Sequence, residues 1–153
     1  MKKILVINSG SSSIKYELFN IKEKDDYEIL AKGIADRIGI DDSSIMHQRY
    51  DSEPLMLKMD LPNHRTAIHA IQDLLVDPER GVLKNIKEIE GVGHRVVHGG
   101  EDFTGSVNIS NDVIKAIKKN AELAPLHNPP NLLGIEATSE SLPEVPQVAV
   151  FDT

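Results

Sequence analysis

The stretch that decides the fold is residues 4–18, ILVINSGSSSIKYEL, near the start of the chain. Its first four residues are apolar, and a turn made of serines and one glycine follows Asn8. From residue 14 to residue 18 the chain then alternates between apolar and charged side chains. Alternation with a period of two is typical of a half-buried strand. The stretch therefore predicts two antiparallel strands that are joined by a tight polar turn.

The turn between these strands has the composition of a phosphate site. Small residues let a ligand approach backbone N–H groups closely, and the hydroxyl groups add further donors. The candidate contacts are Ser11 and Ser13 in the turn, Asn8 before it and Lys15 after it. The turn is not a P-loop, because Walker A requires a second glycine beside Lys-Ser/Thr and a helix directly afterwards. An ordinary hairpin with a serine-rich turn remains the alternative.

Composition favours one globular domain with a hydrophobic core. The chain has 153 residues, 40% of them hydrophobic, and a net charge of −7. This charge argues against nucleic acid as a partner, because binding to a phosphate backbone depends on clustered Lys and Arg. The absence of cysteine excludes disulfides and thiolate metal sites. No apolar run has the length of a membrane span or a signal-peptide core, so we expect a cytoplasmic protein without a membrane partner.

The remaining periodic segments predict an α/β fold. Three strands at the start form an antiparallel meander, and two right-handed crossovers then add two more strands. The result is a mixed five-stranded sheet with the first strand central and helices on its faces, plus an accessory hairpin. The strands after the first hairpin are expected at 27–38, 91–100 and 147–151, the hairpin at 43–61, and the helices after caps at Asn63, Ser110 and Asn128.

Three polar motifs follow strands that should be parallel, namely the serine-rich turn, residues 94–100 and Asp152. Ligands of open α/β sheets bind at the carboxyl ends of the strands, so these motifs should share one edge. Alternation places Arg95 and Val97 on one face, where they could hold the charged and methyl ends of a small carboxylate. A simple ion pair of Arg95 with an acidic neighbour is the alternative.

The histidines and the last carboxylate leave several interpretations open. His94 and His98 share a face and could bind zinc, although no third ligand is evident. His127 stands before Asn-Pro-Pro, which presents it rigidly, but it could equally be a capping or core histidine. Asp152 follows a buried strand, where a carboxylate is often a metal ligand, an acid–base group or a cap.

Four motifs together resemble the amino-terminal part of the acetate kinase family. They are NSGSSSIK at 8–15, GHRVVHGGE at 93–101, LAPLHNPPN at 123–131 and VFDT at 150–153. The resemblance extends from residue 1 to residue 153. It implies a ribonuclease H-like domain, the first of two in an enzyme of the actin-like ATPase and sugar-kinase superfamily. Such an enzyme transfers phosphate between ATP and acetate, giving acetyl phosphate and ADP with Mg²⁺, and works as a homodimer.

The resemblance also implies a role for each candidate residue. It assigns catalysis to Asp152 and Arg95, the substrate carboxylate to Arg95, the methyl pocket to Val97 and Leu126, phosphate or ATP contacts to Lys15, Ser11, Ser13 and His127, and the metal to Asn8. Acetate is already ionised at neutral pH, so formation of acetyl phosphate needs no general base. We therefore expect Asp152 to hold Mg²⁺ or to orient groups around it.

The length of the chain departs from the family pattern, because the family's chain is more than twice as long. A downstream histidine and arginine, an acidic metal ligand and the adenosine pocket are expected beyond this chain. We therefore expect residues 1–153 to form a first domain with no turnover of its own. The alternatives are a free-standing domain that binds phosphate or regulates a partner, and a kinase for propionate or butyrate, against which Val97 favours the smaller acyl group.

Overall fold

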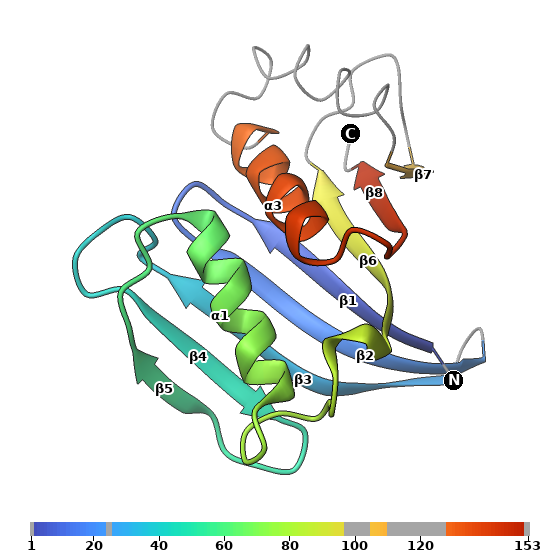
Figure 1. Cartoon of the computed structure of the whole chain (residues 1–153), viewed down its shortest axis with the longest axis horizontal. Helices are drawn as coiled ribbons and strands as arrows, with labels where there is room; N and C mark the ends of the chain where they lie inside the picture. The colour runs from blue at the N-terminus through green and yellow to red at the C-terminus, as the bar shows by residue number, and fades with distance from the viewer. Residues whose placement is uncertain (1, 24–25, 97–104, 110–127, 152–153) are drawn as a thin grey trace.

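The structure is a computed structural model of the chain, and it describes residues 2–23, 26–96, 105–109 and 128–151. Eight strands, two α-helices and one short 3₁₀ helix are defined within these ranges (Figure 1). In chain order they are β1 (Lys2–Ser9), β2 (Ile14–Glu23), β3 (Asp26–Asp36), β4 (Ser44–Arg49), β5 (Leu55–Lys58), α1 (His64–Val76), η1 (Ile86–Glu88), β6 (Ile89–Val96), β7 (Gly105–Asn108), α3 (Asn128–Ser141) and β8 (Gln147–Phe151).

The described strands form one mixed sheet in the order β5-β4-β3-β2-β1-β6-β8-β7. β1 pairs with β2 in antiparallel and with β6 in parallel orientation, and β8 runs parallel to β6. The predicted meander, the central position of the first strand and the two parallel additions are therefore confirmed. As a consequence the carboxyl ends of β1, β6 and β8 meet at one edge, which is where the polar motifs were expected.

The sheet is larger than the predicted five strands. The predicted accessory hairpin continues the sheet as β4 and β5, because β4 pairs with β3 along its whole length. These two strands form although their hydrophobic alternation is weak, because strands near a sheet edge gain backbone hydrogen bonds even where only part of one face is buried. β7 was not predicted; its four residues pair with β8 and carry little pattern of their own. The helix expected after Ser110 lies outside the described residues.

The helix α1 begins and ends where its sequence signals predicted. The side chain of Asn63 accepts a hydrogen bond from the Thr66 N–H at 2.8 Å, which satisfies one of the open amides of the first turn. Extended backbone at Asp77, before Pro78, ends the helix. α3 begins at Asn128, one residue earlier than predicted. No helix in the described ranges is long and apolar enough to cross a membrane.

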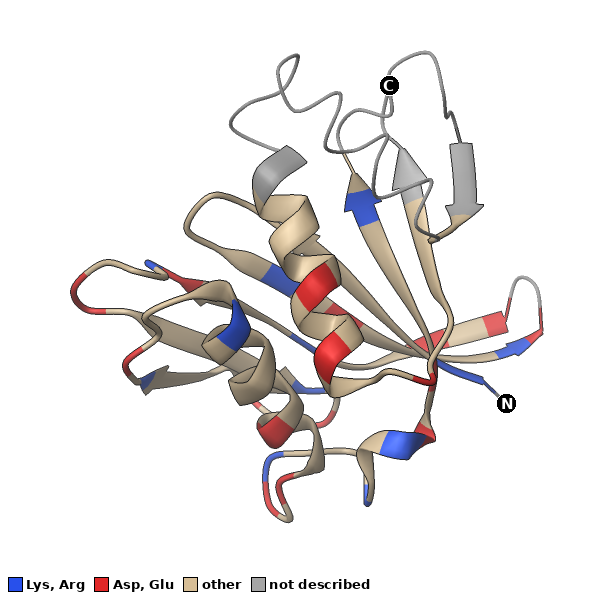
Figure 2. Cartoon of the chain, turned by 45° about the horizontal axis from the view of Figure 1, so that its top comes forward, with Lys and Arg blue, Asp and Glu red and all other residues tan. Residues whose placement is uncertain are grey.

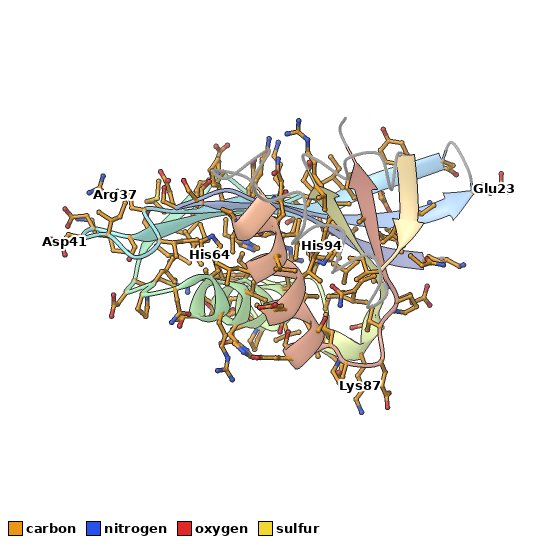
Figure 3. The ribbon with its side chains drawn as sticks, turned by 90° about the horizontal axis from the view of Figure 1, so that it is seen from above. Glu23, Arg37, Asp41, His64, Lys87 and His94 are labelled. Carbon is orange, nitrogen blue, oxygen red and sulfur yellow. The ribbon has the colours of Figure 1, made fainter. Side chains whose placement is uncertain are left out.

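Both described helices cover the same face of the sheet, as Figure 1 and the edge-on view of Figure 3 show. The apolar stripe of α1 and the inward side chains of the strands form the main hydrophobic core. Burial of each large aliphatic side chain contributes about 1.5–3 kcal/mol. The largest fully buried side chains are Tyr16, Leu5, Ile7, Ile14, Leu18, Ile45, Leu61, Ile68, Ile71, Leu75 and Ile89.

A series of buried hydrogen bonds crosses this core next to Gly33. The Tyr16 hydroxyl donates to His47 Nδ1 at 2.5 Å, and His47 Nε2–H donates to the Arg80 carbonyl at 2.9 Å. Because Nε2 carries the proton, Nδ1 is free to accept, and the imidazole is neutral. Burial raises the pKa of the Tyr16 hydroxyl and lowers the pKa of His47, against the hydrogen bond to Arg80, which raises it.

Candidate functional site

A row of side chains crosses four strands near the carboxyl end of β1. Lys15 on β2 pairs with Asn8 on β1 and with Ile34 on β3. The parallel register between β1 and β6 pairs Ile7 with His94, and its next step brings Arg95 beside Asn8. Alternation places this row on the sheet face opposite the helices. The register, and not proximity in the chain, therefore brings the two cations to the same place.

An open pocket of about 440 Å³ lies over this row. Two cationic side chains, Lys15 and Arg95, are exposed at it, and Figure 2 shows the basic colour at the head of β6. Residues of the serine-rich turn form its other wall. The lining residues are Asn8, Ser9, Gly10, Ser13, Lys15, Ile34 and Arg95. Small polar groups between two cations make this pocket suitable for a phosphate or carboxylate group.

The structure brings together four of the predicted site residues, Asn8, Ser13, Lys15 and Arg95, around this one pocket. Ser11 lies in the same turn but is exposed and does not line the pocket. The other predicted residues, Val97, Leu126, His127 and Asp152, lie outside the described residues, and so does His98.

A second pocket, of about 560 Å³, lies at the opposite end of β6, between η1 and the connection from α3 to β8. Its walls are mostly apolar, and its charged residues are Lys87, Glu90 and Glu144. This balance does not favour an anion. The chemistry expected at the strand ends therefore belongs to the smaller pocket.

The serine-rich turn is fixed through its carbonyl groups. Asn131 Nδ2, from α3, donates to the Ser9 carbonyl at 2.8 Å, and His64 Nε2, from the first turn of α1, donates to the Gly10 carbonyl at 2.7 Å. Inside the turn, the Gly10 N–H donates to the Ser13 carbonyl at 2.7 Å. Sequence reasoning missed His64 altogether, because nothing local marks it. Asn131 is the last residue of the motif at 123–131, and nothing else in the sequence marked it as a site residue.

His94 points to the helix side of the sheet, away from Arg95, as the alternation predicted (Figure 3). Its Nε2 lies 2.6 Å from Gln147 Oε1, and the amide of the same glutamine donates to Ser139. Oε1 must therefore accept, so His94 Nε2 carries a proton and is not available to a metal. Among the described residues no group of three His, Asp or Glu side chains could hold a metal ion. This geometry does not support the zinc alternative.

Acid should destabilise the fold through His94. Burial lowers the pKa of His94 from its ordinary 6.5 to about 4, although the hydrogen bond to Gln147 raises it in part. Between these values the unfolded chain binds a proton that the folded chain does not, so stability is complete above about pH 6.5 and falls toward pH 4. The slope is about 1.4 kcal/mol per pH unit, or about 3 kcal/mol over the window. His47, whose pKa is also lowered, adds a loss of the same sign.

Urea unfolding at several pH values between 7 and 4.5 measures this loss. The His94→Gln variant should show a shallower dependence on pH than the parent chain, whatever its stability at pH 7. His69→Gln, at an exposed position on α1, is the matched control and should keep the parent's slope. Equal slopes for His94→Gln and the parent would contradict the assignment.

The described residues offer only a partial set of magnesium ligands. The Asn8 side chain supplies one oxygen of the hard type that Mg²⁺ prefers, and Asn8 lines the pocket of about 440 Å³ at the strand ends. Mg²⁺ sites on nucleotides are commonly completed by substrate phosphates, waters and one or two carboxylates. The pocket therefore fits a metal that arrives with a phosphate ligand rather than one held by a protein cage.

Comparison with known proteins gives a consistent result. The model of the Acetokinase family matches residues 3–153. The acetate kinase of Natranaerobius thermophilus is 52% identical over 151 residues, which are 99% of this chain and 37% of that protein. The chain thus spans about 37% of the length of such curated relatives.

Solved structures agree with the sequence relatives. The crystal structure of Porphyromonas gingivalis acetate kinase superimposes on this chain with a TM-score of 0.95 and 41% identity, covering 100% of this chain and 38% of that one. A propionate kinase from Francisella tularensis gives a TM-score of 0.86 with 35% identity, covering 99% of this chain and 37% of that one. Both similarities extend over the whole described sheet and its two helices.

Proposed function

Because the chain belongs to the acetokinase family, we propose that it is the first domain of an enzyme that transfers a phosphoryl group between ATP and acetate. The products in the forward direction are acetyl phosphate and ADP. The observation that carries the proposal is the pocket at the strand ends, where Asn8, Ser13, Lys15 and Arg95 meet. Two cations and several small donors suit the negative charge of a phosphoryl group and of a carboxylate.

In this mechanism the residues of the chain position charge rather than form bonds. Phosphoryl transfer is accelerated chiefly by positioning and by electrostatic stabilisation of the oxygens around phosphorus. Arg95 presents a planar guanidinium that can hold two oxygens at once, so it binds the acetate carboxylate and then the transferring phosphoryl group. Lys15 and the hydroxyl of Ser13 contact the phosphates of the nucleotide, with Ser11 available in the same turn and His127 as a further contact.

The remaining roles complete the reaction without a general base. Acetate is ionised at neutral pH and attacks phosphorus directly, so no proton has to be removed. Asn8 would contact Mg²⁺ brought with ATP, and the metal would neutralise charge on the phosphate oxygens. We assign Asp152 to the same metal and Val97 with Leu126 to the methyl group of acetate.

The chain of 153 residues should show no measurable turnover by itself. A single positioned arginine can contribute about 10³–10⁵ in rate, and the proposal places further such groups and the adenosine pocket in the rest of the enzyme. One domain also cannot exclude water from the reacting groups. A hydroxamate assay for acetyl phosphate on the purified chain, with ATP, Mg²⁺ and acetate, measures this directly.

Complementation is the informative second arm of that assay. The remaining part of the Natranaerobius thermophilus acetate kinase, added in trans or joined to this chain, should restore turnover. Robust turnover by the chain alone would contradict the division of the site between two domains. Phosphate binding without any recovery of turnover would favour the alternative of a free-standing binding or regulatory domain.

The likeness to both an acetate and a propionate kinase makes the acyl group a testable part of the proposal. We propose acetate as the preferred substrate, because the branched side chain of Val97 leaves less room than a smaller residue would. One methylene is worth about 1–3 kcal/mol, so kcat/KM for acetate should exceed that for propionate by about tenfold or more. Val97→Ala should lower the ratio of the two kcat/KM values. An unchanged ratio would show that Val97 does not line the pocket for the methyl group.

The location and the assembly of the enzyme are further parts of this proposal. We propose a cytoplasmic enzyme that works as a homodimer. Light scattering of the joined protein should give the mass of two chains, and a monomer with full activity would contradict the dimer.

A further inference from the structure

The two side chains that hold the serine-rich turn come from different helices and reach consecutive carbonyls. His64 is 7% exposed and Asn131 is 2% exposed, so both hydrogen bonds are sheltered from water. The bonds are 2.7 Å and 2.8 Å long and link residues that are 54 and 122 positions apart. Hydrogen bonds of this kind fix a segment that its own sequence leaves flexible.

The helix α3 can approach the turn because Gly134 faces Ser9. A Cβ atom at position 134 would collide with the Ser9 hydroxyl, so a glycine is required for this contact. α3 thereby lies close enough for Asn131, one turn earlier in the helix, to reach the Ser9 carbonyl. The contact thus serves the geometry of the turn, and not only the packing of the core.

The direction of these bonds fixes the direction of an amide. In a trans peptide the C=O and the following N–H point to opposite sides. His64 holds the Gly10 carbonyl toward α1, so the Ser11 N–H must point away from α1. The Ser12 carbonyl is held as well, by the Ile38 N–H at 2.9 Å. The carbonyl groups of Ser9, Gly10 and Ser12 are thus directed to the protein, so their partial negative charges do not face a bound anion.

We propose that His64 and Asn131 are positioning residues, which fix the backbone at Ser9 and Gly10 so that the Ser11 N–H is directed away from α1 and can donate to a phosphate group bound at the outer side of the turn. This inference rests on the proposed function for the identity of the ligand, but not for the conformation of the turn. A backbone amide can contribute to an anion site only while its peptide keeps its orientation. Without His64 the Gly10–Ser11 peptide could rotate and turn its carbonyl toward the phosphate.

The test separates the hydrogen bond from the space that the side chain fills. His64→Gln keeps a donor of similar reach, whereas His64→Met has nearly the same size without a donor. Asn131→Leu removes the donor on α3 with little change in volume. His69→Met, at an exposed position on the same helix as His64, is the matched control. A urea unfolding curve for each variant reports whether it is folded.

The first readout uses the 153-residue chain without ligand. Residual dipolar couplings of backbone amides report the direction of each N–H. The Ser11 coupling should change in His64→Met and stay at the parent's value in His64→Gln and His69→Met. Couplings within β1 and α1 should be the same in all of them. An unchanged Ser11 coupling in a folded His64→Met chain overturns the proposal.

The second readout is the affinity for inorganic phosphate and for acetyl phosphate, measured by titration. Loss of the charge-assisted hydrogen bond from the Ser11 N–H to the phosphate should weaken binding about tenfold in His64→Met. Asn131→Leu releases the neighbouring Ser9 carbonyl and should weaken binding in the same direction. His64→Gln and His69→Met should stay within about twofold of the parent. Equal affinities of the Met and Gln variants would overturn the positioning role.

The two readouts keep this proposal distinct from the proposed function. If the parent chain binds neither phosphate nor acetyl phosphate, the turn is not a phosphate site, and the assignment of the ligand fails. The dipolar couplings of the ligand-free chain still decide, in that case, whether His64 fixes the peptide.

Discussion

Arg95→Ala is expected to lower kcat/KM of the joined, active enzyme by about 10³-fold or more. Arg95 lies at the carboxyl end of β6, exposed at the pocket that also holds Asn8 and Lys15. The guanidinium would face both the carboxylate and the moving phosphoryl group, and it can contact two oxygens at once. Removal of this charge should raise KM for acetate and lower kcat, because the same group contacts ground state and transition state.

Two further variants show whether the loss of activity comes from the bidentate geometry of the Arg95 guanidinium. Arg95→Lys keeps a positive charge but loses bidentate geometry, so it should recover only a small part of the rate. Arg65→Ala, on the exposed surface of α1, removes an arginine that pairs with Glu140 at 2.8 Å and should leave the rate unchanged. If Arg95→Ala kept more than a tenth of the parent activity, Arg95 would not be the carboxylate and phosphoryl contact.

Gly33→Ala should destabilise the fold by about 3 kcal/mol or more. A Cβ atom on Gly33 would collide with the Met46 carbonyl and would lie 2.5 Å from the Tyr16 hydroxyl. The strand β4 would have to move, or Tyr16 would have to give up its hydrogen bond to His47. Either change leaves a buried polar group without its partner, which costs about 1–3 kcal/mol in addition to the strain.

Gly93→Ala on β6 provides the matched control for Gly33→Ala. A Cβ atom there would have Val6 Cγ2 at 3.9 Å as its nearest neighbour, which is ordinary contact. This substitution should be neutral or slightly stabilising, because alanine loses less conformational entropy on folding than glycine. Urea unfolding at pH 7 compares the two variants. Equal free energies of unfolding for the two variants would contradict the close packing of Tyr16 against Gly33.

Local pattern was sufficient for the elements that have a single strong periodicity. Alternation in residues 14–18 predicted β2, and the cap at Asn63 with the break at Asp77 predicted α1. The order of these elements then predicted that β1 is central and parallel to β6. The same local reasoning did not find β7, because four residues at an edge carry no clear alternation and gain their place only by pairing with β8.

The sequence by itself determined the family, the central strand and the composition of the turn, because each depends on residues that are near one another in the chain. Register decided the site, since Arg95 reaches Asn8 and Lys15 only through the pairing of β6 with β1 and of β1 with β2. The tertiary structure alone identified His64 and Asn131, whose hydrogen bonds to the turn join residues far apart in sequence. Such contacts leave no local pattern, because packing of the helices on the sheet determines which side chains meet.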